Sequence, residues 1–186
     1  MIRSRFFLLI LLLAVCAAAL PSAALAKENT TSPVPALAGD WQIDLTRSTE
    51  LSPWKDCILH IKIAGDAVTI DRELGWASRQ FTDTMTVHVG RTVTVPVTMW
   101  PENRHLGAYI SDDHTKQVRA DLLDDGRLLR LSTDLVLETQ QGPRDVNILS
   151  DYKISASGTQ LTVTEIRSTR NQPIVYIFNR VNAATK

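Results

Sequence analysis

Alternation between apolar and polar residues constrains the fold of this chain more than any other feature, and it continues from Gly39 almost to the C-terminus. In the clearest run, residues 127–138, four leucines share one phase: Leu129, Leu131, Leu135 and Leu137. Successive side chains of a β-strand point to opposite faces, so a two-residue period is typical of a strand with one buried face. We therefore expect these leucines to point inward and the polar residues between them to face water.

Short turns separate the alternating runs. Asp125-Gly126 and Ser157-Gly158 each lie between two of them, and an Asp-Gly pair between strands is a strong hairpin signal. No helical pattern of useful length and no internal repeat follows the first 26 residues. Further alternating runs occupy residues 57–63, 68–74, 85–89, 93–97, 146–154 and 174–178.

This pattern predicts an all-β fold. We expect an up-and-down antiparallel β-barrel of about 8–10 strands, because consecutive hairpins can close and so remove exposed sheet edges. A two-sheet sandwich is the alternative, since the same alternation serves both. Pro96 cannot donate a backbone hydrogen bond, so its strand should lie at an edge or carry a bulge.

The first 26 residues predict export. Arg3 and Arg5 precede an apolar run over residues 6–20, and Ala-Leu-Ala at 24–26 is a cleavage pattern for a signal peptidase before Lys27. The apolar run is too short to cross a bilayer comfortably, which takes about 20 residues. The sequence thus predicts a protein that is periplasmic or secreted.

Three segments follow from this interpretation: a signal peptide over residues 1–26, a flexible N-terminal tail over residues 27–38 and one barrel domain over residues 39–186. Cys16 offers an alternative, because lipidation there would attach the protein to a membrane. Val15 departs from the small residue that usually precedes an acylated cysteine. We expect a membrane contact only if Cys16 is lipidated.

Composition excludes some partners of the predicted mature chain, residues 27–186. Without Arg3 and Arg5 it has 18 basic and 20 acidic residues, a net charge of −2, and no block of like charge. A phosphate-binding surface needs clustered Lys and Arg, so nucleic acid is not an expected partner. Cys57 is the only cysteine of this segment, which predicts a buried thiol and no intramolecular disulfide.

Three short motifs occur in an order that resembles the lipocalins. Gly39-Asp40-Trp41 opens the first strand, Ser150-Asp151-Tyr152 lies late in the chain, and Arg180 ends the last strand. The resemblance implies that Trp41 closes the floor of the barrel and that Arg180 packs across its ring, as a structural plug. Ser150 replaces the threonine of the family, and the interval between the first two motifs is longer than usual. Residues 39–45 are also similar to the start of bacterial exported lipocalin-like (calycin-type) domains, which are mostly of unassigned function.

The chain carries no recognisable catalytic signature. It lacks a Gly-x-Ser-x-Gly motif, a glycine-rich phosphate loop and, after the leader, a Cys-x-x-Cys pair. His60, His88, His105 and His114 are scattered, and Asp112-Asp113-His114 is typical of a solvated turn. We therefore expect no metal site, no cofactor and no enzymatic activity.

The resemblance implies an exported, non-catalytic protein that holds a small apolar or amphipathic ligand in a barrel cavity. An eight-stranded barrel is just wide enough for one small ligand. A carrier needs a cavity of about 300–1,000 Å³ lined mainly by apolar side chains. The expected ligand-binding residues, with two tyrosine hydroxyls to orient a polar end, are Tyr152, Tyr176, Phe178, Leu129 and Leu131.

Two other functions remain open. Residues 36–41, followed by Cys57, resemble exported barrel inhibitors of bacterial metalloproteases, which suggests a protein-binding module of the cell envelope. Those inhibitors normally hold a disulfide, which this chain cannot make, and they would have a filled interior. An enzyme inside the barrel would instead show converging polar groups with perturbed protonation.

Overall fold

The computed structural model describes residues 36–51, 53–97, 108–110 and 113–181. All of them belong to the compact unit Pro33–Lys186, which is considered by itself. The predicted signal peptide, Cys16 and most of the predicted tail lie outside the described residues, as do Trp100, His105 and Asp112.

The described residues form an all-β fold, and none of them belongs to a helix that is long and apolar enough to span a membrane. Eleven strands follow one another: β1 (Gly39–Ile43), β2 (Asp56–Ala64), β3 (Ala67–Trp76), β4 (Arg79–His88), β5 (Thr92–Pro96), β6 (Ala108–Ile110), β7 (Thr115–Leu123), β8 (Leu128–Thr139), β9 (Gly142–Ile154), β10 (Gln160–Arg167) and β11 (Ile174–Arg180).

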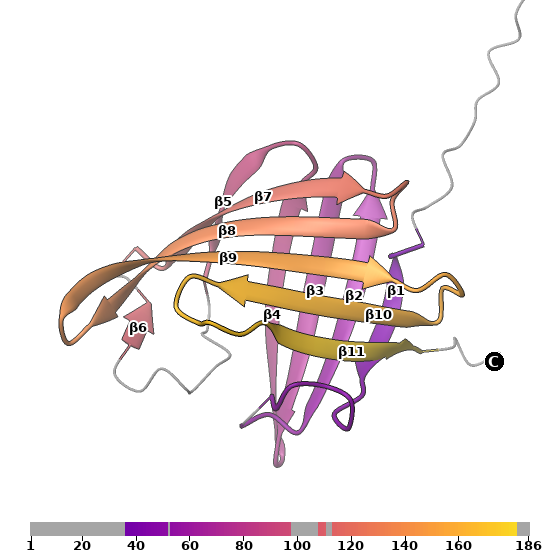
Figure 1. Cartoon of the computed structure of the whole chain (residues 1–186), viewed down its shortest axis with the longest axis horizontal. Coiled ribbons are helices and arrows are strands. Elements are labelled where there is room, and N and C mark those ends of the chain that lie inside the picture. Colours follow the sequence, from indigo (N-terminus) through magenta and orange to yellow (C-terminus); the bar gives the residue numbers. More distant parts are fainter. Residues whose placement is uncertain (1–35, 52, 98–107, 111–112, 182–186) are drawn as a thin grey trace, which may run out of the picture. The chain divides into compact units, whose positions relative to one another are not determined.

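The strands form one antiparallel sheet that curls into a nearly closed barrel (Figure 1). Its order is β4-β3-β2-β1-β11-β10-β9-β8-β7-β5, and β6 pairs with β8. Nearly every strand therefore pairs with its neighbours in sequence, which confirms the predicted up-and-down barrel with ten strands on the main path. Pro96 ends β5, which pairs only with β7, so the prediction of an edge position is also confirmed.

The barrel has a seam between β4 and β5. Among the described strands no backbone ladder joins these two edges. At one end the connection between them contacts β7, where Val89 forms a bridge with Ala120 and the Gly90 amide donates a 2.8 Å hydrogen bond to the Ala120 carbonyl. This seam is the open side of the sheet, and the site described below lies next to it.

The four leucines of β8 are buried, as their phase predicts. Leu129 and Leu131 belong to the main core. Leu135 and Leu137 instead form a second, smaller cluster with Val146 of β9. The cause is the length of the β8–β9 hairpin, which extends past the neighbouring strands (Figure 1).

One end of the barrel is closed around Trp41. Its side chain is fully buried, and the guanidinium carbon of Arg180 lies 4.0 Å from the centroid of its ring, the arrangement that the lipocalin resemblance implies. The indole Nε1 donates a 3.1 Å hydrogen bond to the carbonyl of Leu37, and Arg180 Nη1 donates a 2.9 Å hydrogen bond to the carbonyl of Ala38.

The last residues of the predicted flexible tail are therefore part of the fold. Leu37 is fully buried in the main core, and the Ala36 carbonyl accepts a hydrogen bond from Arg180. The prediction of a flexible tail is wrong at residues 36–38, because the indole and guanidinium groups at the barrel floor need backbone acceptors that this segment provides.

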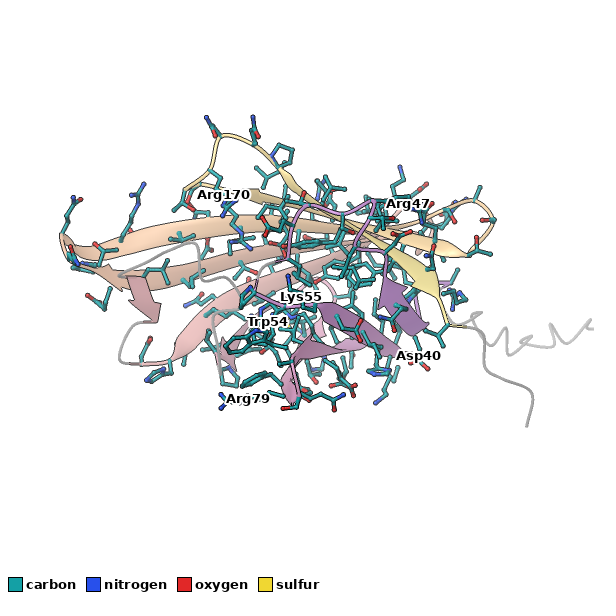
Figure 2. All side chains as sticks on the ribbon, turned by 90° about the horizontal axis from the view of Figure 1, so that it is seen from below. Asp40, Arg47, Trp54, Lys55, Arg79 and Arg170 are labelled. Carbon is teal, nitrogen blue, oxygen red and sulfur yellow. The ribbon has the colours of Figure 1, made fainter. Side chains whose placement is uncertain are left out.

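Residues 44–51 and 53–55 connect β1 to β2 at the lower end of the barrel in Figure 1. The segment is tied to β11, since the Ile177 amide donates a 2.9 Å hydrogen bond to Ser48 Oγ. Trp54 is buried and packs edge-on against Phe81 of β4, with 5.1 Å between ring centroids. Figure 2 views the molecule from this end, with Trp54 and Lys55 near the middle.

Candidate ligand-binding site

Charged side chains point into the barrel from β10. Leu161 and Val163 are buried core residues, and the same phase continues to Glu165 and Arg167. The Glu165 side chain is 11% exposed and that of Arg167 is 5% exposed, whereas Ile166 between them is 55% exposed on the outer face. Arg167 Nη2 donates a 2.6 Å hydrogen bond to Glu165 Oε2, so the two form an ion pair inside the protein.

A second interior ion pair joins β3 and β4. Arg72 follows the buried phase of Val68 and Ile70, and it lies directly opposite Asp83 in the strand register. Arg72 Nη2 donates a 2.6 Å hydrogen bond to Asp83 Oδ2. Burial alone would lower the pKa of Arg72, but the surrounding acidic groups, with Asp83 the strongest of them, together outweigh this effect, and the pKa lies above its ordinary value. Arg72 therefore stays charged inside the barrel.

The two ion pairs line a cavity of about 80 Å³. Lys116 of β7 contributes a third cation, and Tyr152, Ser150 and Thr133 contribute hydroxyl groups. The apolar part of the lining is Leu59, Ile70, Met85, Val97, Leu131, Leu135 and Ile148. The cavity lies beside the seam. Its lining includes Asp83 and Met85 of β4, Val97 just after β5, and Lys116 of β7.

A smaller cavity of about 20 Å³ adjoins the first. Leu59, Arg72, Tyr152 and Glu165 line both cavities, so this group of side chains separates them. The rest of its lining is almost wholly apolar: Ile43, Leu51, Cys57, Val163, Tyr176 and Phe178.

The described interior is mostly filled, and side chains occupy the space between the strands in Figure 2. Both cavities fall below the size of about 300–1,000 Å³ that is typical of ligand pockets. The core is apolar as expected, but the larger cavity differs from the expected apolar lining, because five ionisable side chains with formal charges line it.

The lining carries an excess of positive charge. Arg72, Lys116 and Arg167 face the carboxylates of Asp83 and Glu165, so three cations meet two anions when all five groups are ionised. A buried charge is costly unless it is paired and hydrogen-bonded. The described part of the cavity is thus electrostatically suited to one additional negative charge.

Burial perturbs the ionisation of these groups. It raises the pKa of Glu165, and it raises that of Tyr152, where the negative charge of Glu165 adds to the effect. Burial lowers the pKa of Lys116, and it lowers the pKa of Arg167 to about 10, which still leaves the guanidinium charged at neutral pH. Such clusters of perturbed groups in a cavity are characteristic of functional sites.

The structure places the residues predicted to bind a ligand at different points of the interior. Leu131 lines the larger cavity, Tyr176 and Phe178 line the smaller one, and Tyr152 lines both. Leu129 is fully buried in the core and lines neither.

The charged residues of the site were not foreseen from the sequence. The two-residue period of β10 contained the information, because Glu165 and Arg167 occupy the positions that continue the inward face of Leu161 and Val163. An exposed Ile166 in the same strand is the complementary sign that the apolar-inside pattern is broken there.

No metal centre accompanies this cluster. Within the described residues, no group of three or more His, Cys, Asp or Glu side chains could hold a metal ion. His60 lies on the outer face of β2, where Nδ1 is 2.7 Å from Asp40 Oδ1 and Nε2 is 3.5 Å from Glu73 Oε1.

No protein-family model and no curated protein sequence matches the chain. Solved structures do match in fold. Lipid binding protein 8 of Caenorhabditis elegans has a TM-score of 0.50 and 9% sequence identity, over 78% of this chain and 96% of that one. The fatty acid binding protein of Schistosoma mansoni in complex with arachidonic acid has a TM-score of 0.50 and 7% identity, over 80% and 98%.

These similarities establish the fold, an antiparallel β-barrel, and at such identities they establish nothing more. They agree with the lipocalin-like architecture that the sequence motifs implied. The alternative of a barrel-type protease inhibitor receives no support from them.

Proposed function

We propose that this protein binds a small amphipathic molecule with an anionic head inside its barrel and does not transform it. The observation that carries this proposal is the cavity in which three cations face two carboxylates. A ligand carboxylate would neutralise the excess charge and accept charge-assisted hydrogen bonds, which are about twice as strong as neutral ones.

Donors for such a head are present. The buried Nε of Arg72 has no hydrogen-bond acceptor among the described residues, and the hydroxyls of Tyr152, Ser150 and Thr133 line the same space. Guanidinium groups are well suited to carboxylates because their planar N–H groups match the two oxygens.

The apolar end of the ligand would extend toward the seam. Met85 of β4 and Val97, which follows β5, line the cavity beside the seam, where no ladder closes the described sheet. The cavity of about 80 Å³ favours a short chain, or one that emerges through the seam. Two proteins of this fold are named as binding lipid or fatty acid, which fits a ligand of this class.

Calorimetric titration of folded protein with octanoate and with 1-octanol tests the proposal. We expect saturable binding of octanoate in the micromolar range and at least about tenfold weaker binding of the alcohol, since loss of one charged hydrogen-bonded partner costs about 1.5–3 kcal/mol. Titration with shorter and longer alkyl carboxylates would show how long an alkyl chain the cavity accommodates. Mass spectrometry should recover the ligand unchanged.

A matched pair of variants locates the site. Lys116→Met removes a cation from the cavity, whereas Lys62→Met removes one that pairs with Asp71 on the outer face. The first should weaken octanoate binding several-fold and the second should leave it unchanged. Absence of saturable binding by folded wild-type protein would refute the proposed function.

We further propose that the protein is exported, as the leader over residues 1–26 suggests. N-terminal sequencing of the exported protein should begin at Lys27. An acylated N-terminal Cys16 would instead indicate a membrane-attached form.

A further inference from the structure

Glu165 is the interior carboxylate that lines both cavities, and it is paired with Arg167 two residues along the same strand. Asp83, the other interior carboxylate, is held by Arg72 in the neighbouring ion pair. Each carboxylate therefore neutralises one guanidinium, and the charge of Lys116 is left as the excess.

Among the described residues, the charged and titratable groups near Glu165 come from several strands and one connecting segment. Arg72 comes from β3, Lys116 from β7, Tyr152 from β9, and Arg170 from the segment after β10. Cys57 of β2 and Tyr176 of β11 share the lining of the smaller cavity with it. In the described part of the barrel, no carboxylate other than Glu165 and Asp83 lines either cavity.

We propose that the site selects singly charged anions over doubly charged ones, and that Glu165 sets this preference. This inference rests on the proposed function. One negative charge balances the charged side chains that line the described cavity, whereas a second would exceed the positive charge of this lining and would face Glu165 and Asp83. Like charges brought together in a water-poor site repel strongly, because the effective dielectric is low.

Octyl sulfate and octyl phosphate test this preference with nearly the same shape. Both heads are tetrahedral, but the sulfate carries one charge, and the phosphate approaches two at pH 8 because its second pKa is about 6. Wild-type protein should bind octyl sulfate at least about tenfold more tightly than octyl phosphate. Equal or tighter binding of the phosphate would overturn the inference.

Glu165→Gln removes one negative charge while keeping the shape of the side chain. It should raise the affinity for octyl phosphate relative to octyl sulfate by at least about tenfold. Glu73→Gln is the matched control, because Glu73 lies on the outer face of β3 beside His60, and it should leave the ratio unchanged. An unchanged ratio in folded Glu165→Gln would refute the role of Glu165.

The two proposals fail in different ways. If octanoate binds but octyl sulfate and octyl phosphate bind with equal affinity, the proposed function is supported and the proposed charge preference is wrong. If octanoate, octyl sulfate and octyl phosphate all fail to bind folded wild-type protein, both the proposed function and the proposed charge preference are wrong. Should Glu165→Gln not fold, the wild-type comparison of sulfate with phosphate decides the charge preference by itself.

Discussion

Trp41, Arg180 and Gly39 close one end of the barrel through contacts that depend on one another. Arg180 can lie over the indole only because Gly39 has no side chain, since a Cβ built there would overlap Nη1 of Arg180. Gly39 also has a φ of +138°, which L-residues with a side chain rarely adopt. The first and last strands are thereby joined at the floor.

Trp41→Ala should lower the free energy of unfolding by about 3–5 kcal/mol, because a fully buried indole is replaced by a cavity. Chemical denaturation of both proteins measures the difference. Trp76→Ala is the control, since Trp76 is 45% exposed, and it should cost much less. Equal midpoints for wild type and Trp41→Ala would contradict a structural role for Trp41.

Gly39→Ala should destabilise the protein more than Gly90→Ala does. Both glycines have positive φ, and such strain costs about 1–3 kcal/mol, but a Cβ at Gly90 meets nothing within 4 Å. The difference between the two variants therefore contains the clash with Arg180 together with the difference in backbone strain between φ values of +138° and +79°. It should shrink when Arg180→Ala is combined with Gly39→Ala, and an undiminished difference would show that the clash is not the cause.

Cys57 should make stability fall as the pH rises above 9. Burial raises the pKa of its thiol from 9.0 to about 12, so between these values the unfolded chain loses a proton that the folded protein keeps. Ionisation then favours unfolding, with a slope of up to about 1.4 kcal/mol per pH unit from one group. Tyr152, whose pKa is also raised, acts in the same direction.

Cys57→Ala separates the two groups, because it removes only the thiol. The variant should start from a lower stability and then lose less than wild type between pH 9 and 11, as followed by urea unfolding at each pH. Parallel pH profiles for the two proteins would show that Cys57 does not titrate as its burial requires.

At the scale of the element, β10 shows what sequence patterns could and could not predict. The alternation of apolar and polar residues, together with the Asp-Gly turn, predicted the barrel, because half-buried strands require a two-residue period. The same pattern does not indicate that Glu165 and Arg167 point inward, because the polar residues of a half-buried strand are expected to face water and an unpaired buried charge is costly. These two side chains are paired with one another. The second ion pair, Arg72 with Asp83, depends on the register between β3 and β4, which the sequence of one strand alone does not reveal.

Replacing both members of the β10 pair should be milder than replacing one. Arg167→Met leaves Glu165 buried without its nearest cation and should cost about 3–5 kcal/mol. The double variant Glu165→Met/Arg167→Met removes both charges and should recover most of this loss, as denaturant unfolding would show. Additive losses in the double variant would mean that the pair is not energetically coupled.

At the scale of the whole barrel, the described strands form a meander whose two end strands, β4 and β5, face each other without a ladder. Trp41 closes one end of this barrel, and Asp83, Met85 and Lys116 line the interior cavity beside the seam. The charged site therefore lies beside the two open edges of the main strand path, which connects the topology of the barrel to its proposed ligand.

Hydrogen exchange should therefore distinguish the seam from the rest of the barrel. Every second amide of β4 points away from β3 and should exchange much faster than the amides of β9, which are bonded to strands on both sides over residues 148–154.

Octanoate at a hundredfold excess over its Kd should stabilise the folded state by about 2.7 kcal/mol. Slowed exchange should then be largest at β4 and β7, whose side chains line the cavity. If seam amides were as protected as those of β9 before octanoate is added, the seam would not be the route by which a ligand enters.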